Sequence, residues 1–234
     1  MQRHFFWVFF LIALFAFSGP NLAYGDCPAV DGNAAALPSN DSNGHIGPTK
    51  DSAGPILERT LLIRIAPALS PLTLHLIPDV SAPNTWDVVH HVGRVEVCKQ
   101  GSSVPFQTIE FNAYPDVSLW ISNFHILDVN FDGYADLGAL YDFGAKFGSY
   151  QFWIFDPKSQ RFVQNQLTDE LREIRANDDV FDPASKTIHS QYLNFNEGVI
   201  GETYQVSDDH LVLIEVEERV KDDHGEFQAV KRKP

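Results

Sequence analysis

The stretch SYQFWIFDPKSQRF, residues 149–162, contains the signals that decide the fold. Aromatic and β-branched residues dominate its first half, which is typical of a β-strand. Asp156 and Pro157 then interrupt the apolar run, and this pair favours a tight turn because proline fixes its own φ angle. Apolar character returns at Phe162. The stretch therefore predicts a hairpin of two antiparallel strands joined by a short turn.

The turn at residues 155–162 (FDPKSQRF) has a close counterpart at residues 181–188 (FDPASKTI). This repetition predicts successive hairpins stacked in one sheet. Other short β-type runs follow Leu57, separated by Gly, Pro, Asn and Asp: RTLLIRIA, LTLHLI, GRVEVC, FQTIEF, SLWISNFHIL, TIHSQYL, ETYQV and LVLIEVEER. We interpret the final run VKRKP, residues 230–234, as a solvated tail.

One segment has helical periodicity. Residues 167–177, LTDELREIRAN, place Leu167, Leu171 and Ile174 on one face of a helix, and Thr168 precedes acidic residues as an N-cap would. We therefore predict a mainly β fold: a compact antiparallel domain, propeller-like or a sandwich, with one short helix and a calcium loop between strands.

The N-terminus has the features of a secretory signal peptide. Arg3 precedes an apolar run at residues 5–17, and Ala23 and Gly25 supply the small residues before a cleavage site. A membrane anchor, the alternative, needs roughly 20 apolar residues, and this run is shorter. We predict cleavage after Gly25 and export to the periplasm, with no membrane span in the mature protein.

Composition and charge limit the classes of partner. Residues 26–57 are rich in Gly, Pro, Ser, Asn and Asp without periodicity, so we expect a flexible linker ahead of one β domain at 58–234. The chain of 234 residues has 17 basic and 31 acidic residues, a net charge of −14, and loss of Arg3 with the signal peptide makes it −15. This charge disfavours nucleic acid and anionic membranes and favours a basic partner.

Two cysteines, Cys27 and Cys98, are present in a chain expected to enter an oxidising compartment. A disulfide between them would tie the linker to the folded domain. The alternative is a buried free thiol at Cys98 and an unpaired Cys27 in the linker.

Residues 128–137, DVNFDGYADL, have the ligand spacing of a calcium loop. Oxygen ligands fall at positions one, three, five, seven and nine: Asp128, Asn130, Asp132, the carbonyl of Tyr134, and Asp136. Gly133 stands at the sharp turn, and Ala139 replaces the usual glutamate at position twelve, so this is the short form of the loop. A β-turn with solvated carboxylates is the alternative. Without an ion the carboxylates would repel one another.

No catalytic machinery is recognisable. A G-x-S-x-G motif and a glycine-rich phosphate loop are both absent, and no nucleophile, base and orienting group can be assembled. We therefore expect a protein that is not an enzyme, and an exported enzyme of unknown type is the weaker reading.

The order of these motifs resembles a family of exported bacterial β-proteins related to periplasmic lysozyme inhibitors. The resemblance covers roughly residues 91–217 and rests on LDVNFDGYADL, on the glycine-containing loop that leads into YQFWIFDP, and on FDPASKTIHS and HLVLIEVEE. Members of that family include immunity proteins against peptidoglycan hydrolases injected by a type IV secretion system. The resemblance implies inhibition of a lysozyme-like peptidoglycan hydrolase, a protein partner, without catalysis.

The resemblance also implies that a loop enters the active-site cleft of the hydrolase. The corresponding segment is 143–150, and its candidate partner-binding residues are Gly144, Lys146, Gly148, Ser149 and Tyr150. The two glycines permit sharp turns, and Tyr150 combines a flat apolar ring with a hydroxyl group. The alternative is an ordinary hairpin whose aromatic residues pack on the core. Residues 194–201, NFNEGVIG, form the next glycine-bearing loop.

A second class of function remains open. The pattern D-x-N-x-D-G-x-x-D also occurs in integrin-type repeats, which would make the protein a calcium-dependent adhesion or carbohydrate-binding module. Such chains repeat the motif, whereas this chain contains it once.

Overall fold

The structure is a computed structural model, and it describes residues 27, 58–79, 81, 89–114, 123–143, 148–174, 180–194, 198–222 and 224–234. The expected signal peptide, residues 1–25, lies outside the described residues. So does the expected linker, residues 26–57, apart from Cys27.

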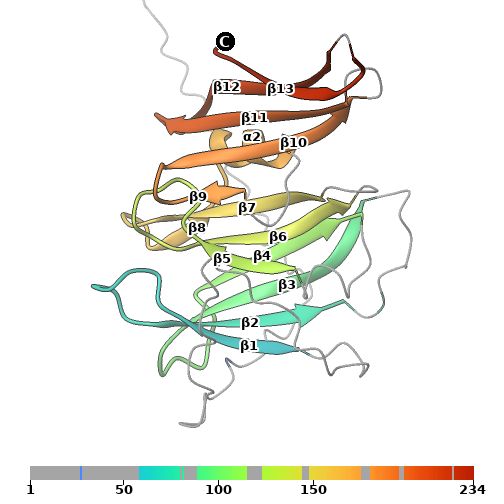
Figure 1. The fold of residues 1–234 in the computed structure, drawn as a ribbon. Coiled ribbons are helices and arrows are strands. Elements are labelled where there is room, and N and C mark those ends of the chain that lie inside the picture. Colours follow the sequence, from blue (N-terminus) through green and yellow to red (C-terminus); the bar gives the residue numbers. More distant parts are fainter. Residues whose placement is uncertain are drawn as a thin grey trace, which may run out of the picture.

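The described chain forms three antiparallel sheets in which sequence neighbours pair (Figure 1). The first contains β1 (Arg59–Ile63), β2 (Leu72–Pro78), β3 (His90–Lys99) and β4 (Gln107–Ala113). The second contains β5 (Phe124–Leu127), β6 (Asp136–Phe143), β7 (Gly148–Asp156) and β8 (Arg161–Val163). The third contains β9 (Phe181–Asp182), β10 (Thr187–Asn194), β11 (Gly198–Ser207), β12 (His210–Lys221) and β13 (Phe227–Arg232). The predicted mainly antiparallel β class is confirmed.

The three sheets follow one another in chain order, from β1 at one end of the molecule to β13 at the other (Figure 1). Each sheet is a meander of consecutive strands. A single helix, α2 (Gln166–Glu173), occurs among the described residues, between β8 and β9. None of the helical structure in this part of the chain has the length and hydrophobicity that a membrane-spanning helix needs.

Strand β7 explains why the stretch at 149–162 is so apolar. Trp153 and Phe155 point into a core shared with the first sheet, where Trp153 packs 4.4 Å from Phe111, measured between ring centroids. Phe152 and Ile154 point the other way, into a second core formed with α2 and β10. A strand buried on both faces has no need of polar alternation. β7 therefore joins the two hydrophobic cores.

Both predicted hairpins form, but they belong to different sheets. Phe155 pairs with Phe162 between β7 and β8, and Ile188 pairs with Phe181 between β9 and β10. The prediction that they stack in one sheet is wrong. Helix α2 intervenes between them and packs its buried face into the second core, so the second sheet ends at β8 and a new sheet begins at β9.

The helix begins at a different cap from the one predicted. Asn165, with extended φ and ψ of −145° and −170°, is the N-cap, and its side chain accepts a hydrogen bond from the Thr168 N–H. Thr168 accepts in return from the Asn165 N–H at 2.9 Å, which completes a capping box. Ile174 is extended, so the helix ends at Glu173, before the predicted residue 177.

The C-terminal segment is also more ordered than predicted. Residues 227–232 form β13, which pairs with β12, so the interpretation of residues 230–234 as a solvated tail is wrong for Val230 to Arg232. Lys231 contacts Glu215 at 2.6 Å, and Arg232 contacts Glu218 at 3.2 Å. Side chains on β13 nevertheless remain exposed. Pairing with an acidic neighbour explains why this basic segment forms a strand.

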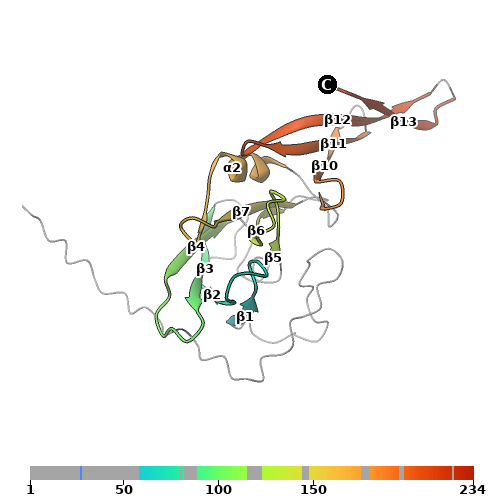
Figure 2. The ribbon, with the colours of Figure 1, turned by 90° about the vertical axis from the view of Figure 1, so that its left-hand side faces the viewer.

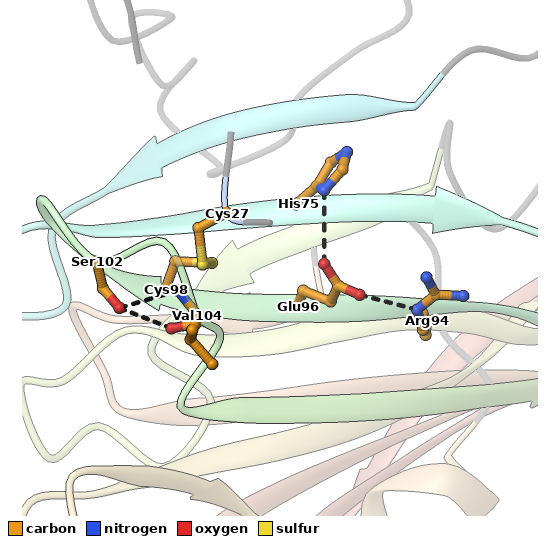
Figure 3. Close-up of a disulfide and its surroundings, with 7 residues drawn as sticks. All are labelled: Cys27, His75, Arg94, Glu96, Cys98, Ser102 and Val104. Atoms are coloured by element: carbon orange, nitrogen blue, oxygen red, sulfur yellow. Dashed lines mark hydrogen bonds and ion pairs between the residues drawn. A yellow bond between two sulfur atoms is a disulfide. The ribbon is translucent and has the colours of Figure 1, made fainter. Parts of the chain in front are cut away.

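Cys27 and Cys98 form a disulfide, as Figure 3 shows. The Cys27 N–H also donates to the Ser103 carbonyl at 2.8 Å. On the same face of β3, Glu96 is fully buried and accepts from the Arg94 Nε at 3.0 Å, while His75 Nδ1 lies 3.7 Å from its other oxygen (Figure 3). On this face of β3, Glu96 and Cys98 are therefore buried, and Glu96 forms an ion pair with Arg94.

Candidate calcium loop and the β6–β7 hairpin

The predicted calcium loop lies between β5 and β6. Its tight path requires left-handed backbone at Phe131, with φ of 60°, and at Gly133, with φ of 90°. No atom lies within 4 Å of a Cβ built at Gly133, so backbone conformation, and not space, selects glycine there. Gly133 thus occupies the turn position that the sequence pattern predicts.

Hydrogen bonds draw the first three predicted ligands together. The Asp132 N–H donates to Asp128 Oδ1 at 3.0 Å and to Asn130 Oδ1 at 3.2 Å, so these two oxygens converge on one donor. The second oxygen of Asp128 accepts from the Gly133 N–H at 2.8 Å. Asp132 in turn accepts from the Tyr134 N–H at 2.9 Å. Asn130 Nδ2 also donates to Asp132 Oδ2 at 2.9 Å, so the three side chains are joined to one another and to the backbone of the loop.

Asp136 differs from the other ligands because it is buried. Its side chain is 0% exposed and accepts from the Val129 N–H at 2.9 Å and from the Phe155 N–H at 2.8 Å. Burial raises the pKa of Asp136 to about 7, against the lowering effect of these two hydrogen bonds, and the charges of Asp132 and Asp128 raise it further. Asp136 therefore links the loop to the C-terminal end of β7.

The types of side chain in the loop fit calcium, but their positions do not form a binding site for the ion. Carboxylate, amide and carbonyl oxygens are hard ligands that calcium prefers. Within the described residues, however, no group of three or more His, Cys, Asp or Glu side chains is placed to hold a metal ion. The carboxylate of Asp136 is directed at two backbone amides. Calcium binding at this loop therefore stays a prediction.

The anchoring role of Asp136 was missed by sequence reasoning. The pattern identified Asp136 as the closing ligand of a loop, but its partner Phe155 is 19 residues away. No local pattern in the sequence connects these two residues.

The predicted partner-binding segment joins β6 to β7. Gly144 and Lys146 lie outside the described residues. Gly148 is buried where β7 begins and pairs with Phe143, and Ser149 is half-buried opposite Asp142. The described part of this segment is thus the base of a hairpin.

Tyr150 is half-buried and its ring packs against the second core. The ring meets His125 edge-on, with centroids 4.8 Å apart and planes at 80°, and lies 6.2 Å from the ring of Phe152. For the ring of Tyr150, this packing agrees with the alternative of an ordinary hairpin whose aromatic residues pack on the core. Its predicted contact with a partner is untested.

Comparisons with known proteins assign no family to the chain. No protein-family model matches it, and no curated protein matches it. A solved structure of a Xanthomonas type IV secretion system related protein is similar over 76% of this chain and 95% of that chain, with 16% sequence identity and a TM-score of 0.49. At this level of similarity we draw no functional conclusion from it.

Proposed function

We propose that the protein is an exported, non-enzymatic inhibitor or immunity protein of the periplasm. It blocks a lysozyme-like peptidoglycan hydrolase when the segment between β6 and β7 enters the active-site cleft of that enzyme. A calcium ion in the 128–136 loop supports this hairpin. The motif order in the sequence suggested this function, and one structural observation favours it.

That observation is the link that Asp136 makes between the calcium loop and the hairpin. Asp136 is the first residue of β6, and its carboxylate accepts from the Phe155 N–H near the end of β7. Both strands that carry the tip are therefore joined at their base by a buried hydrogen bond. A tip held on fixed strands loses less conformational entropy when it enters a cleft, so binding is stronger.

The chemistry of the loop supports calcium as the ion. Asp136 is a buried carboxylate whose nearest charges are negative, and a divalent cation would offset both the burial and the repulsion. The disulfide between Cys27 and Cys98 suits the oxidising periplasm. The net charge of −14, or −15 once the expected signal peptide with Arg3 is removed, would attract a basic hydrolase and speed its association.

A turbidity assay on peptidoglycan with a panel of lysozymes tests the proposed inhibition. We expect the protein to slow clearing by at least one enzyme, and replacement of residues 146–149 by glycines to abolish this effect. The matched control replaces Asp208 and Asp209 by glycine in the β11–β12 turn, where both residues have positive φ angles that glycine adopts freely.

The control should inhibit as well as the parent, and both variants should melt within a few degrees of it. If the 146–149 variant inhibits normally, the β6–β7 segment is not the inhibitory element. Binding to the wall without inhibition would instead support a carbohydrate-binding module, and clearing by the protein alone would reveal an enzyme.

Calcium is tested separately by thermal unfolding. A chelator should lower the melting temperature of the parent, because an ion that binds only the folded state stabilises it. In the presence of calcium, Asp132→Ala should have a lower melting temperature than the parent, and the chelator should not lower it further. Equal melting curves for the parent with calcium and with chelator would exclude a bound structural ion.

A further inference from the structure

A cavity of about 550 Å³ lies between α2 and the third sheet. Figures 1 and 2 both place α2 beside the face of β10, β11 and β12, and these four elements supply the cavity walls. Among the described residues that line the cavity, none belongs to the predicted calcium loop or to strands β6 and β7. The described walls of the cavity are therefore distinct from the base of the proposed inhibitory hairpin.

Glu202 on β11 is held in the cavity by two phenol groups. The Tyr204 hydroxyl donates to Glu202 Oε2 at 2.7 Å, and the Tyr192 hydroxyl donates to Oε1 at 3.3 Å. Burial, with the hydrogen bond to Glu202 and its negative charge, raises the pKa of Tyr204, so this phenol keeps its proton and remains a donor. These contacts fix the position of the carboxylate.

Within the described residues, no basic side chain balances the charge of Glu202. Among the ion pairs of the described residues, none joins Glu202 to a basic side chain. Two phenols occupy only part of the hydrogen-bonding capacity of a carboxylate, which has about four lone-pair sites. Glu202 can therefore accept from a further donor that enters the cavity.

Helix α2 adds two more carboxylates on the opposite wall. Glu170 accepts from the Leu211 N–H at 2.7 Å, and this bond lowers the pKa of Glu170, with His210 Nδ1 contributing at 3.0 Å. Glu173 stands at the rim with its side chain 82% exposed, and Arg172 Nε approaches it only to 4.0 Å. Negative charge thus faces the cavity from both sides.

The remaining walls are mostly apolar, with Ser190 as a further polar residue. The rings of Tyr192 and Tyr204 and the side chains of Ile174 and Leu211 line the space between the carboxylates. A ligand that fits has an apolar stem and a cationic end, because the stem gains from contact with these walls and the cation from Glu202. Lysine and arginine side chains have this construction, whereas an anion would be repelled.

We infer that the cavity between α2 and the third sheet binds a lysine or arginine side chain presented by a protein partner, with Glu202 as the central acceptor. The tyrosine rings contact the stem of that side chain. Glu173 at the rim attracts it before it enters. This binding does not depend on the proposed inhibition of a hydrolase.

NMR titration of the whole protein tests the inference. N-acetyl-lysine methylamide and its arginine analogue are the probes, and N-acetyl-norleucine methylamide is the uncharged control with a similar stem. We expect saturable shifts of the Ser190, Glu202 and Leu211 amide signals with a Kd on the order of 1 mM. Norleucine should give no saturable shift.

Matched variants identify the acceptor. Glu202→Gln keeps an oxygen acceptor for one phenol and places an NH2 donor beside the other, whose hydroxyl oxygen can accept from it. The variant loses the charge, so lysine binding should weaken about tenfold. Glu173→Gln, at the exposed rim, should weaken it about twofold without affecting the fold. Glu226→Gln removes the same charge from an exposed position elsewhere and should bind like the parent.

Several results would overturn the inference. These are unchanged amide signals with both cationic probes, equal shifts with norleucine, or equal weakening by Glu226→Gln and Glu202→Gln. If Glu202→Gln fails to fold, the parent titrations and Glu173→Gln decide the question. Unchanged lysine binding in Glu173→Gln would then count against it.

Discussion

At the scale of single residues, Asp136 makes stability depend on pH and calcium together. The pKa of Asp136 is about 7 in the folded protein, against an ordinary value of 3.8 for an aspartate. The folded protein therefore holds the proton on this carboxyl more tightly than the unfolded chain does. In calcium-free protein, the contribution of Asp136 to stability should therefore fall by a few kcal/mol as the pH rises from about 4 to about 7. A bound cation favours the charged carboxylate and should remove this fall.

Chemical denaturation at about pH 5 and about pH 8, with calcium and with chelator, measures the effect. Asp136→Asn provides the control, because an amide does not titrate and should remove the contribution of this site from the pH dependence in chelator. The same fall in stability with and without calcium would mean that no ion reaches Asp136.

Tyr150 combines two roles that substitutions can separate. Its ring packs on His125 and the second core, so Tyr150→Ala should destabilise the protein by roughly 3 kcal/mol or less, the range for truncating a half-buried aromatic. Tyr150→Phe keeps the ring and loses only the hydroxyl. If the hydroxyl contacts the hydrolase, Tyr150→Phe should weaken inhibition by more than any change in its melting temperature accounts for. Normal inhibition by that variant would limit Tyr150 to packing.

At the scale of elements, the stability of α2 depends on its capping box. Asn165→Ala removes the acceptor for the Thr168 N–H and should cost about 1 kcal/mol of unfolding free energy. Urea denaturation measures this loss. Gln166→Ala, one residue further along and exposed, is the control and should have almost no effect. An equal loss in both variants would argue against the assigned cap.

The elements also show which parts of the fold were predictable. Both hairpin turns were predicted because Asp-Pro chemistry is local: Asp156 and Asp182 each accept from backbone N–H groups in their own turns. The division of those hairpins between two sheets was not predicted, since it depends on how α2 packs. Asn165 and Thr168 are both good N-cap residues, and only the backbone conformation identifies the cap.

The candidate sites also divide into local ones that the sequence predicts and non-local ones that it does not. The calcium pattern lies in nine consecutive residues, so the sequence identified every candidate ligand from Asp128 to Asp136. The cavity around Glu202 combines residues from α2, β10, β11 and β12, and no local pattern connects them. Sites assembled from separate elements need the tertiary structure before they can be recognised.

At the scale of the whole molecule, the three sheets are arranged in a row, and each is held to the next by a hydrophobic core. The first and second sheets are held by a shared core and by Gln107, which both donates to and accepts from the backbone of Phe162. The second and third are held by the core around α2. The β12–β13 hairpin extends beyond this core (Figure 2), and its exposed residues include Val220 and Phe227.

The disulfide anchors the N-terminal end of this row. It joins residues 71 apart, and closing a loop of that size stabilises the folded state by about 4 kcal/mol in the chain-entropy model. Cys98→Ser should therefore lower the stability by several kcal/mol and speed protease cleavage ahead of residue 58. The double variant Cys27→Ser/Cys98→Ser should behave like the single variant, and reductant should bring the parent to the same level. Mass spectrometry of the exported parent should detect no alkylatable thiol, and two reactive thiols in native protein would contradict the pairing.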